Sequence, residues 1–238
     1  GVVSPQFYSG SDYVTVKVAN SQFTDNTNNS IGQARNATIT GNTINNSGGI
    51  GLSENTTVTN NVISNSTGCI SIMDEHTDST HTISNNQIYD NDCHGISISG
   101  ENSTATINIT NNTIARNTGI GIYSIEGMHT ANITNNFIAE NGKGGIKVNA
   151  GLETLNVRYN RINGNNANKI SNTSTHAQDY HGSALYLLDN INPNDGDLDT
   201  YEYNSITGAV TSTGTIISLI YKERGNSIVR YNNFQNIA

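Results

Sequence analysis

The feature that most constrains this chain is an internal repeat of about 24 residues. Three near-copies follow one another: ISNNQIYDNDCHGISI from residue 83, ITNNTIARNTGIGIYS from 109 and ITNNFIAENGKGGIKV from 133. The first half of each copy reads apolar-x-x-Asn-x-apolar. Nine copies of this half occupy the chain, with the polar residue at Ser21, Asn42, Asn61, Asn86, Asn112, Asn136, Asn160, Asn204 and Asn232. A chain of this kind is expected to fold as stacked copies of one unit.

The second half of the repeat places a glycine before an apolar-x-apolar triplet. Clear examples are Gly49–Leu52, Gly95–Ile98, Gly119–Ile122 and Gly145–Val148. In both halves the apolar residues alternate with period two, which is the spacing of a strand with one buried face. Asn, Ser, Thr, Gly and Ile are abundant, which argues against helices. The sequence therefore predicts short strands separated by turns.

One coil of this repeat is too small to be stable alone. It buries about four apolar side chains at about 1.5–3 kcal/mol each, whereas ordering its residues costs about 1–2 kcal/mol apiece. The coils must therefore stack, and the repeated Asn can then bond the amides above and below it in a ladder. We expect an all-β parallel solenoid of about nine coils with an internal Asn ladder. It forms one domain, residues 13–238, after an N-terminal segment, residues 1–12.

The repeat resembles that of the right-handed parallel β-helix proteins, the pectate-lyase-like superfamily with its secreted carbohydrate-binding and sugar-hydrolase repeats. The resemblance covers roughly residues 13–236. It implies a single right-handed parallel β-helix. It does not select an activity, because unrelated functions share this scaffold.

Composition narrows the classes of partner. The net charge is −8 and Lys and Arg are scattered, which argues against nucleic acid as a partner. No apolar run is long enough for a transmembrane span. The many hydroxyl residues favour an extracellular or cell-surface setting. Asn-x-Ser/Thr sequons, the acceptors of N-glycosylation, occur at Asn36, Asn55, Asn65, Asn102, Asn132 and Asn172 among others.

The two cysteines, Cys69 and Cys93, lie in successive copies of the repeat. In the expected register Cys93 lies about two positions before the column of Cys69, an offset that strains the Cα distance limit of a disulfide. A disulfide between coils and two buried thiols are both open, and the offset favours the thiols.

One candidate catalytic group combines Asp74 and His76 with Asp92 and His94, one coil later. Carboxylates and imidazoles on adjacent coils can supply the acid and the base for chemistry on a uronic-acid sugar. Asp74-Glu75-His76 resembles the aspartate-proline-histidine signature of mannuronan C5-epimerases and related alginate lyases, with Glu75 in place of Pro. The segments around Cys69 and His94 also resemble parts of the polygalacturonase motifs, but the essential Asp pair is replaced by Thr67-Gly68.

Two further features are candidates for binding. Asp195, Asp197 and Asp199, with Asp189 and Glu202 nearby, could offer oxygen ligands to Ca²⁺, although the spacing is not that of an EF-hand. The outward column of the second strand is expected to hold Gly51, Ser71, Ser97, Gly121 and Lys147. Its small side chains suit close approach by a glycan or another protein.

Three functions fit these observations. The first is an extracellular structural or adhesive surface protein that stacks head to tail with like subunits into a filament or surface layer. The second is a polysaccharide lyase, C5-epimerase or hydrolase that acts on acidic cell-surface or matrix glycans through Asp74, His76, Asp92 and His94. The third is a piece of a larger adhesin or tail-spike. The absence of a complete catalytic set favours the first.

Overall fold

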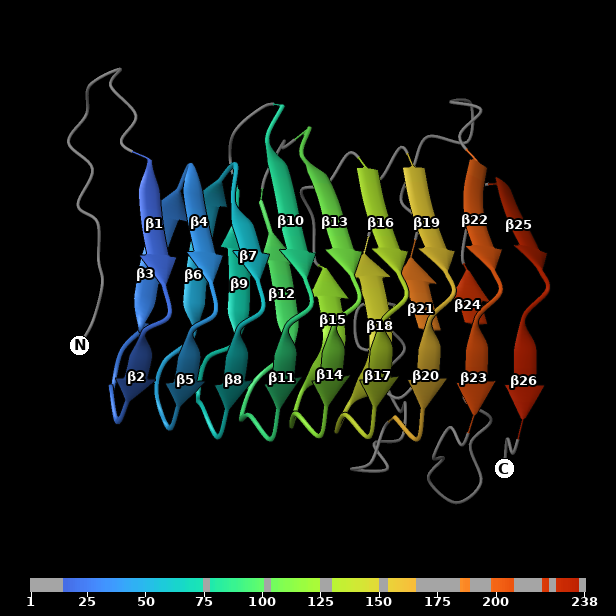
Figure 1. Ribbon diagram of the computed structural model, residues 1–238. Coiled ribbons are helices and arrows are strands. Elements are labelled where there is room, and N and C mark those ends of the chain that lie inside the picture. Colours follow the sequence, from blue (N-terminus) through green and yellow to red (C-terminus); the bar gives the residue numbers. More distant parts are fainter. Residues whose placement is uncertain are drawn as a thin grey trace.

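The computed structural model describes residues 15–74, 78–100, 104–124, 130–149, 154–165, 185–188, 198–207, 220–222 and 226–235. Within these ranges the strands form three parallel sheets that run along one axis (Figure 1). Each sheet takes one strand per coil, so strands that are neighbours in a sheet belong to successive coils. The predicted all-β solenoid is confirmed.

The first sheet, here called the β1 sheet, is nine-stranded in the order β1-β4-β7-β10-β13-β16-β19-β22-β25. Its strands are Val16–Ala19, Ala37–Thr40, Thr57–Thr59, Thr80–Ser84, Thr106–Thr110, Thr130–Thr134, Thr154–Arg158, Leu198–Glu202 and Asn226–Arg230. The β2 sheet is also nine-stranded and follows it after each Asn corner. Its strands β2, β5, β8, β11, β14, β17, β20, β23 and β26 are Gln22–Thr24, Thr43–Asn45, Val62–Ser64, Gln87–Tyr89, Thr113–Ala115, Phe137–Ala139, Arg161–Asn163, Ser205–Thr207 and Asn233–Gln235.

The third or β3 sheet is eight-stranded and closes the coil. Its strands β3, β6, β9, β12, β15, β18, β21 and β24 are Ile31–Arg35, Ile50–Glu54, Ile70–Met73, Ile96–Ser99, Ile120–Ser124, Gly144–Asn149, Leu185–Leu188 and Ile220–Lys222. This sheet contains the Gly-apolar-x-apolar half of the repeat.

The core consists of aliphatic columns in register from coil to coil. Ile39, Val58, Ile83 and Ile109 are paired along the β1 sheet, and each is fully buried. Equivalent isoleucine columns line the other two sheets. Because the same side chain occupies each position in successive coils, the interior of the solenoid is filled at a constant width. One repeated sequence pattern is therefore enough to build a close-packed core.

The predicted Asn ladder is present at the corner between the β1 and β2 sheets. The backbone N–H and the Nδ2 of Asn86 donate to Oδ1 of Asn112 at 2.9 and 3.0 Å. Asn112 in turn donates to Oδ1 of Asn136 and to the carbonyl of Ile83. The same contacts recur from Asn42 to Asn232. Every polar group of these buried side chains is therefore satisfied inside the protein.

A second ladder lies at the C-terminal ends of the β2-sheet strands. It was not among the features expected from the sequence. Nδ2 of Asn91 donates to Oδ1 of Asn117, Asn117 to Asn141 and Asn141 to Asn165, at 2.9–3.0 Å. In the earlier coils Ser47 and Ser66 take this position. Both ends of the short β2-sheet strands are thus fixed by side-chain amides or hydroxyls.

The expected register of the β3 sheet is wrong at one coil. Ser97 pairs with Tyr123, not with Gly121, and Tyr123 pairs with Lys147. Gly121 instead matches Gly95. At both positions an added Cβ would lie within 2.7 Å of a carbonyl oxygen of the following coil, so only glycine fits. Lys147, expected on a flat open column, is only 2% exposed.

The preference for two buried thiols is also wrong, because Cys69 and Cys93 form a disulfide. The two-residue offset is present, since Ile70 pairs with Ile96, which places Cys69 beside Gly95. The Cα atoms are nevertheless 6.3 Å apart, within the range that a disulfide spans.

No described helix has the length and apolar character needed to cross a membrane.

Candidate functional site

Asp74, a candidate catalytic acid or base, lies directly after β9 and is buried, with 1% of its surface exposed. Its Oδ2 lies 2.8 Å from Nε2 of His81, a fully buried residue of β10. Nδ1 of the same imidazole lies 2.7 Å from the Thr56 hydroxyl, one coil earlier. A carboxylate only accepts hydrogen bonds, so Nε2–H of His81 donates to an ionised Asp74, and Nδ1 of the neutral imidazole then accepts from the Thr56 hydroxyl.

This hydroxyl–imidazole–carboxylate chain has the connectivity of a nucleophilic triad. All three side chains are 1% exposed or less, however, so no substrate reaches the Thr56 hydroxyl in this structure. His81 is paired with Ile107 in an inward column of the β1 sheet. The chain therefore satisfies buried polar groups within the core and serves the fold.

His94 lies with Tyr123 and Lys147 on the outer side of the β3 sheet. The rings of His94 and Tyr123 are stacked with centroids 4.4 Å apart. Nζ of Lys147 lies 5.6 Å from the centre of the Tyr123 ring. Nδ1 of His94 accepts the backbone N–H of Ile120 at 2.9 Å, so a neutral His94 carries its proton on Nε2. An imidazole, a phenol and an ammonium group thus meet on three consecutive coils.

The other candidate catalytic residues do not join this cluster. The exposed Asp92 accepts a hydrogen bond from the Thr118 hydroxyl at 2.8 Å. His76 lies outside the described residues. Asp74, Asp92 and His94 therefore each have a different partner in this structure: His81, Thr118 and Tyr123. Tyr123 lies in the column where Gly121 was expected, so its place beside Lys147 could not be predicted from the pattern.

The predicted calcium ligands are only partly described, since Asp189, Asp195 and Asp197 lie outside the described residues. Asp199 is 4% exposed. Its two oxygens accept the N–H of Leu155 at 3.0 Å and the hydroxyl of Tyr201 at 3.1 Å. Within the described ranges no three His, Cys, Asp or Glu side chains lie close enough to hold a metal ion together. The calcium site stays a prediction.

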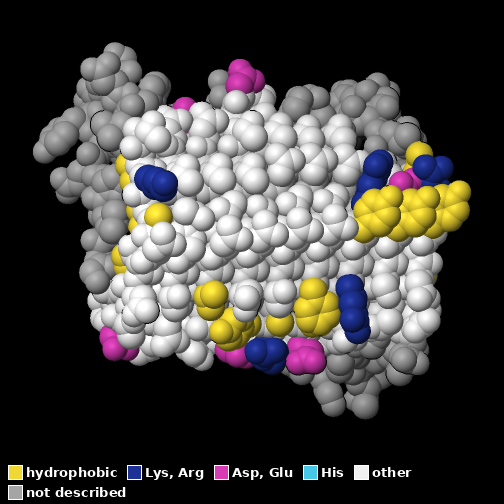
Figure 2. Space-filling model, viewed as in Figure 1, with side chains coloured by type: hydrophobic (Ala, Val, Ile, Leu, Met, Phe, Trp, Pro, Cys, Tyr) yellow, Lys and Arg dark blue, Asp and Glu magenta, His cyan; other side chains and the backbone are white. Residues whose placement is uncertain are grey.

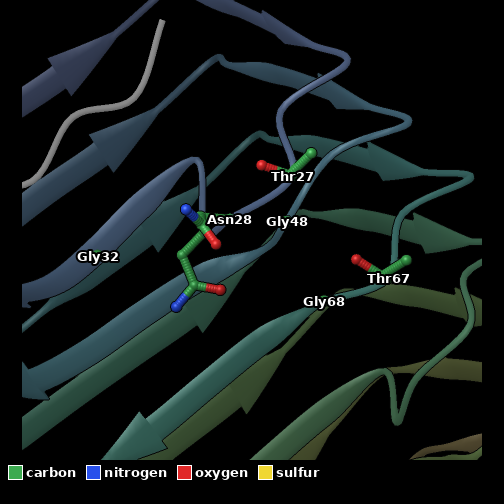
Figure 3. A pocket seen from close by; sticks show the side chains of 7 residues that line it. Thr27, Asn28, Gly32, Gly48, Thr67 and Gly68 are labelled. Carbon is green, nitrogen blue, oxygen red and sulfur yellow. The ribbon is translucent and has the colours of Figure 1, made fainter.

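A pocket of about 560 Å³ lies near the first coils, at the turns between the β2 and β3 sheets. Figure 3 shows the residues that line it, among them Thr27, Asn28, Gly32, Gly48, Thr67 and Gly68. The lining consists of hydroxyls, amides and glycines, without a titratable side chain among the described lining residues. Its described lining can offer hydrogen bonds to a neutral polar group.

The most extensive surface is the outer face of the β1 sheet. Two outward columns consist of Thr, Ser and Asn from one coil to the next: Thr38, Thr57, Thr82, Asn108, Asn132 and Asn156 form the first, and Thr40, Thr59, Ser84, Thr110 and Thr134 the second. Figure 2 shows the resulting broad face, on which the described residues place no charged side chain between the groups at its two ends. We call these two columns the hydroxyl–amide face.

Side-chain hydrogen bonds order part of this face. Nδ2 of Asn132 donates to Oδ1 of Asn108, and Nδ2 of Asn156 to Oδ1 of Asn132, both at 2.9 Å. The Thr59 hydroxyl donates to that of Thr40 at 3.1 Å. The groups repeat at the strand spacing of about 4.8 Å along the axis. The face therefore presents donors and acceptors at regular, fixed intervals.

Comparison with known proteins supports the fold. Residues 6–108 match the family model described as "Right handed beta helix region". No curated protein and no solved structure gives a significant match to the chain.

Proposed function

We propose that this right-handed parallel β-helix is an extracellular adhesive protein of a cell or matrix surface, which lays its hydroxyl–amide face against polysaccharide. The observation that carries the proposal is the face itself, with two uncharged columns of Thr, Ser and Asn in register over many coils. Sugars present hydroxyl groups that both donate and accept, as these side chains do. A repeating surface matches a repeating polymer, so many weak contacts add up.

The Cys69–Cys93 disulfide supports the extracellular setting. Disulfides persist in oxidising compartments and are rare where thiols are kept reduced. The low number of charged side chains on the face supports contact with a solid or densely packed polymer, because few charges must lose their water on binding.

A matched pair of variants within one coil tests the proposal. Thr110 lies on the hydroxyl–amide face and Thr113 on the β2 sheet, and each column already contains an arginine further along, at Arg158 and Arg161. Both Thr110→Arg and Thr113→Arg should therefore fold. We expect the wild type and Thr113→Arg to co-sediment with insoluble cell-wall polysaccharide, and Thr110→Arg to lose most of this binding. A wild-type protein that stays in the supernatant with every polysaccharide, or equal losses in the two variants, would refute the proposal.

Head-to-tail association with like subunits is part of the proposed structural role. In β25 and β26 the side chains of Val229 and Phe234, which continue core columns, are 50% and 40% exposed. Their counterparts Val157 and Ile162 are fully buried. A second copy stacked on these strands would cover them. Electron microscopy of concentrated protein should show filaments, and only single particles would count against this role.

A polysaccharide-active enzyme is the second candidate, and the His94–Tyr123–Lys147 cluster favours it. The Nε2–H of a neutral His94 can donate a hydrogen bond to a sugar oxygen, and the stacked Tyr123 offers a phenol beside it as acid or base. His94→Asn and Tyr123→Phe should each abolish the release of unsaturated or shortened oligosaccharide from acidic glycans. Release that persists in both variants would remove this cluster from consideration.

A further inference from the structure

The corner that joins the β1 and β2 sheets changes character in the last coils. The residue before each ladder position, Ser21 in the first coil and Asn in the others, adopts a left-handed backbone conformation with φ between 51° and 66°. In the earlier coils this residue is Asn20, Gly41, Asn60, Asn85, Asn111 and Asn135. In the last three it is Tyr159, Tyr203 and Tyr231, with φ values of 58°, 56° and 57°. Asn and Gly adopt this conformation readily, whereas for Tyr it is strained, so three successive exceptions suggest a function.

The three tyrosines form one continuous stack. The ring centroids of Tyr159 and Tyr203 are 5.0 Å apart with planes 4° from parallel, and those of Tyr203 and Tyr231 are 4.9 Å apart at 15°. This geometry is an offset stack. The side chains are 55%, 45% and 65% exposed. Figure 2 shows a row of hydrophobic side chains beside basic ones at the C-terminal end of the face, where these residues lie.

Beside the rings is a row of alternating charge. Arg158, Glu202 and Arg230 are paired in register, each directly before one of the tyrosines. Glu202 is buried and bonds Nε of Arg230. Nε of Arg158 lies 3.7 Å from the same carboxylate, beyond hydrogen-bond distance, and is a buried donor without a hydrogen-bond partner. One carboxylate faces two guanidinium groups, which leaves one positive charge in excess beside the stack.

We propose that the tyrosine stack and its arginines form a binding site for a carboxylated polysaccharide, a polyuronate chain that runs along the axis. The apolar C–H faces of the sugar rings would contact the exposed parts of the tyrosines, and a uronate carboxylate would bind the guanidinium groups of Arg158 and Arg230. The rings repeat about every 4.8 Å, as neighbouring strands do, which suits a polymer with a regular repeat. The site uses different residues from the hydroxyl–amide face, so it can be tested independently of the proposed function.

The chain itself supplies a variant that removes the stack without harming the fold. Tyr203→Asn replaces the central ring with the residue found at this corner in five earlier coils, so it also relieves the strained backbone. Arg158→Thr places in this column the residue that precedes it, Thr134. Tyr89→Ser is the matched control, since Tyr89 with Arg116 5.8 Å from its ring is a tyrosine–arginine pair elsewhere on the surface.

Binding should be measured by calorimetry with hexamers of galacturonate, mannuronate and hyaluronan, and with the neutral methyl ester of the galacturonate hexamer. Tyrosine emission gives a second readout because the chain contains no Trp. We expect the wild type and Tyr89→Ser to bind at least one acidic hexamer, more weakly as salt rises. We expect Tyr203→Asn and Arg158→Thr to lower the affinity about tenfold, and the methyl ester to bind no better than these variants.

Two outcomes would overturn the proposal. One is that the wild type binds none of the three acidic hexamers, or binds the methyl ester as tightly as the acid. The other is that Tyr203→Asn, with thermal unfolding at or above that of the wild type, keeps full affinity. Neither outcome affects the test of the proposed function. That test depends on whether Thr110→Arg loses binding to insoluble polysaccharide while Thr113→Arg keeps it.

Discussion

Cys69 and Cys93 are covalently joined across two neighbouring coils, although they lie two positions apart in the strand register. The bond closes a loop with a sequence separation of 24 residues. It ties the turn before β9 to the turn before β12, close to the His94–Tyr123 stack. The disulfide therefore adds a covalent link between two coils beside the step of the second ladder at which Ser66 bonds Asn91.

Removal of this disulfide should lower stability measurably. A closed loop of this length contributes about 3 kcal/mol through the restricted unfolded chain. We expect Cys69→Ser/Cys93→Ser to lose about that amount of unfolding free energy in urea titrations. Dithiothreitol should shift the wild type toward the variant and leave the variant unchanged. A wild type that shows no change on full reduction would contradict the prediction.

The Asn ladder predicts that replacement of one buried ladder Asn lowers the free energy of unfolding by an unusually large amount. Asn112→Ala leaves buried donors of Asn86 and the Ile83 carbonyl without partners. Each unsatisfied group costs about 1–3 kcal/mol, so the loss should reach about 3 kcal/mol or more. Asn108 lies on the outer face of β13, the strand that directly precedes Asn112, and Asn108→Ala should cost less than about 1 kcal/mol. Urea titration of both variants makes the comparison, and equal losses would show that the ladder is not the cause.

The sequence predicted the coil but not every register. Alternation with period two fixes which face of a strand is buried, since a slip of one residue would expose the core. A slip of two residues preserves the faces, and in GIGI, residues 119–122, both Ile120 and Ile122 are buried. Pattern alone could not choose between them. The choice depends on the close approach of Gly121 to the carbonyl of Gly145, which only the stacked coils reveal.

The candidate sites were less predictable for a related reason. Asp74 and His81 are seven residues apart, and the hydroxyl of Thr56 that completes their chain comes from another coil. The tyrosine stack, in contrast, has a signal in the sequence: Tyr159, Tyr203 and Tyr231 each directly precede a ladder Asn. Once the Asn column is known, that position is a column too, and three tyrosines in it must stack.

The buried Thr56–His81–Asp74 chain should behave as one structural unit. His81→Leu places an apolar residue in a column that contains Ile107, but it leaves the Asp74 carboxylate without the imidazole. We expect a loss of about 3 kcal/mol or more, as for a buried pair that loses one partner. The triple variant Thr56→Val/His81→Leu/Asp74→Ala should recover part of this loss, because the unpaired groups are gone. Additive losses in urea titrations would show that the three residues act independently.

The exposed pair of Asp90 and Arg116 should give a small, pH-dependent contribution. Nε and Nη2 of Arg116 donate to the two oxygens of Asp90 at 2.7 and 2.8 Å. These hydrogen bonds, with the charge of Arg116, hold the pKa of Asp90 below its ordinary value and raise that of Arg116.

Because the folded pKa of Asp90 is lower than the unfolded one, the stability contributed by the pair is complete above the ordinary Asp pKa of about 4. It is lost as the pH falls through the folded value. The side chains of Arg116 and Asp90 are 50% and 39% exposed, so solvent screening limits the contribution to less than about 1 kcal/mol. Asp90→Asn, which keeps a residue suited to φ of 57°, should therefore cost less than about 1 kcal/mol at pH 7 and less at pH 2 than at pH 7, as measured by urea titration at both pH values. A difference between wild type and variant that is as large at pH 2 as at pH 7, or larger, would show that the ion pair is not its source.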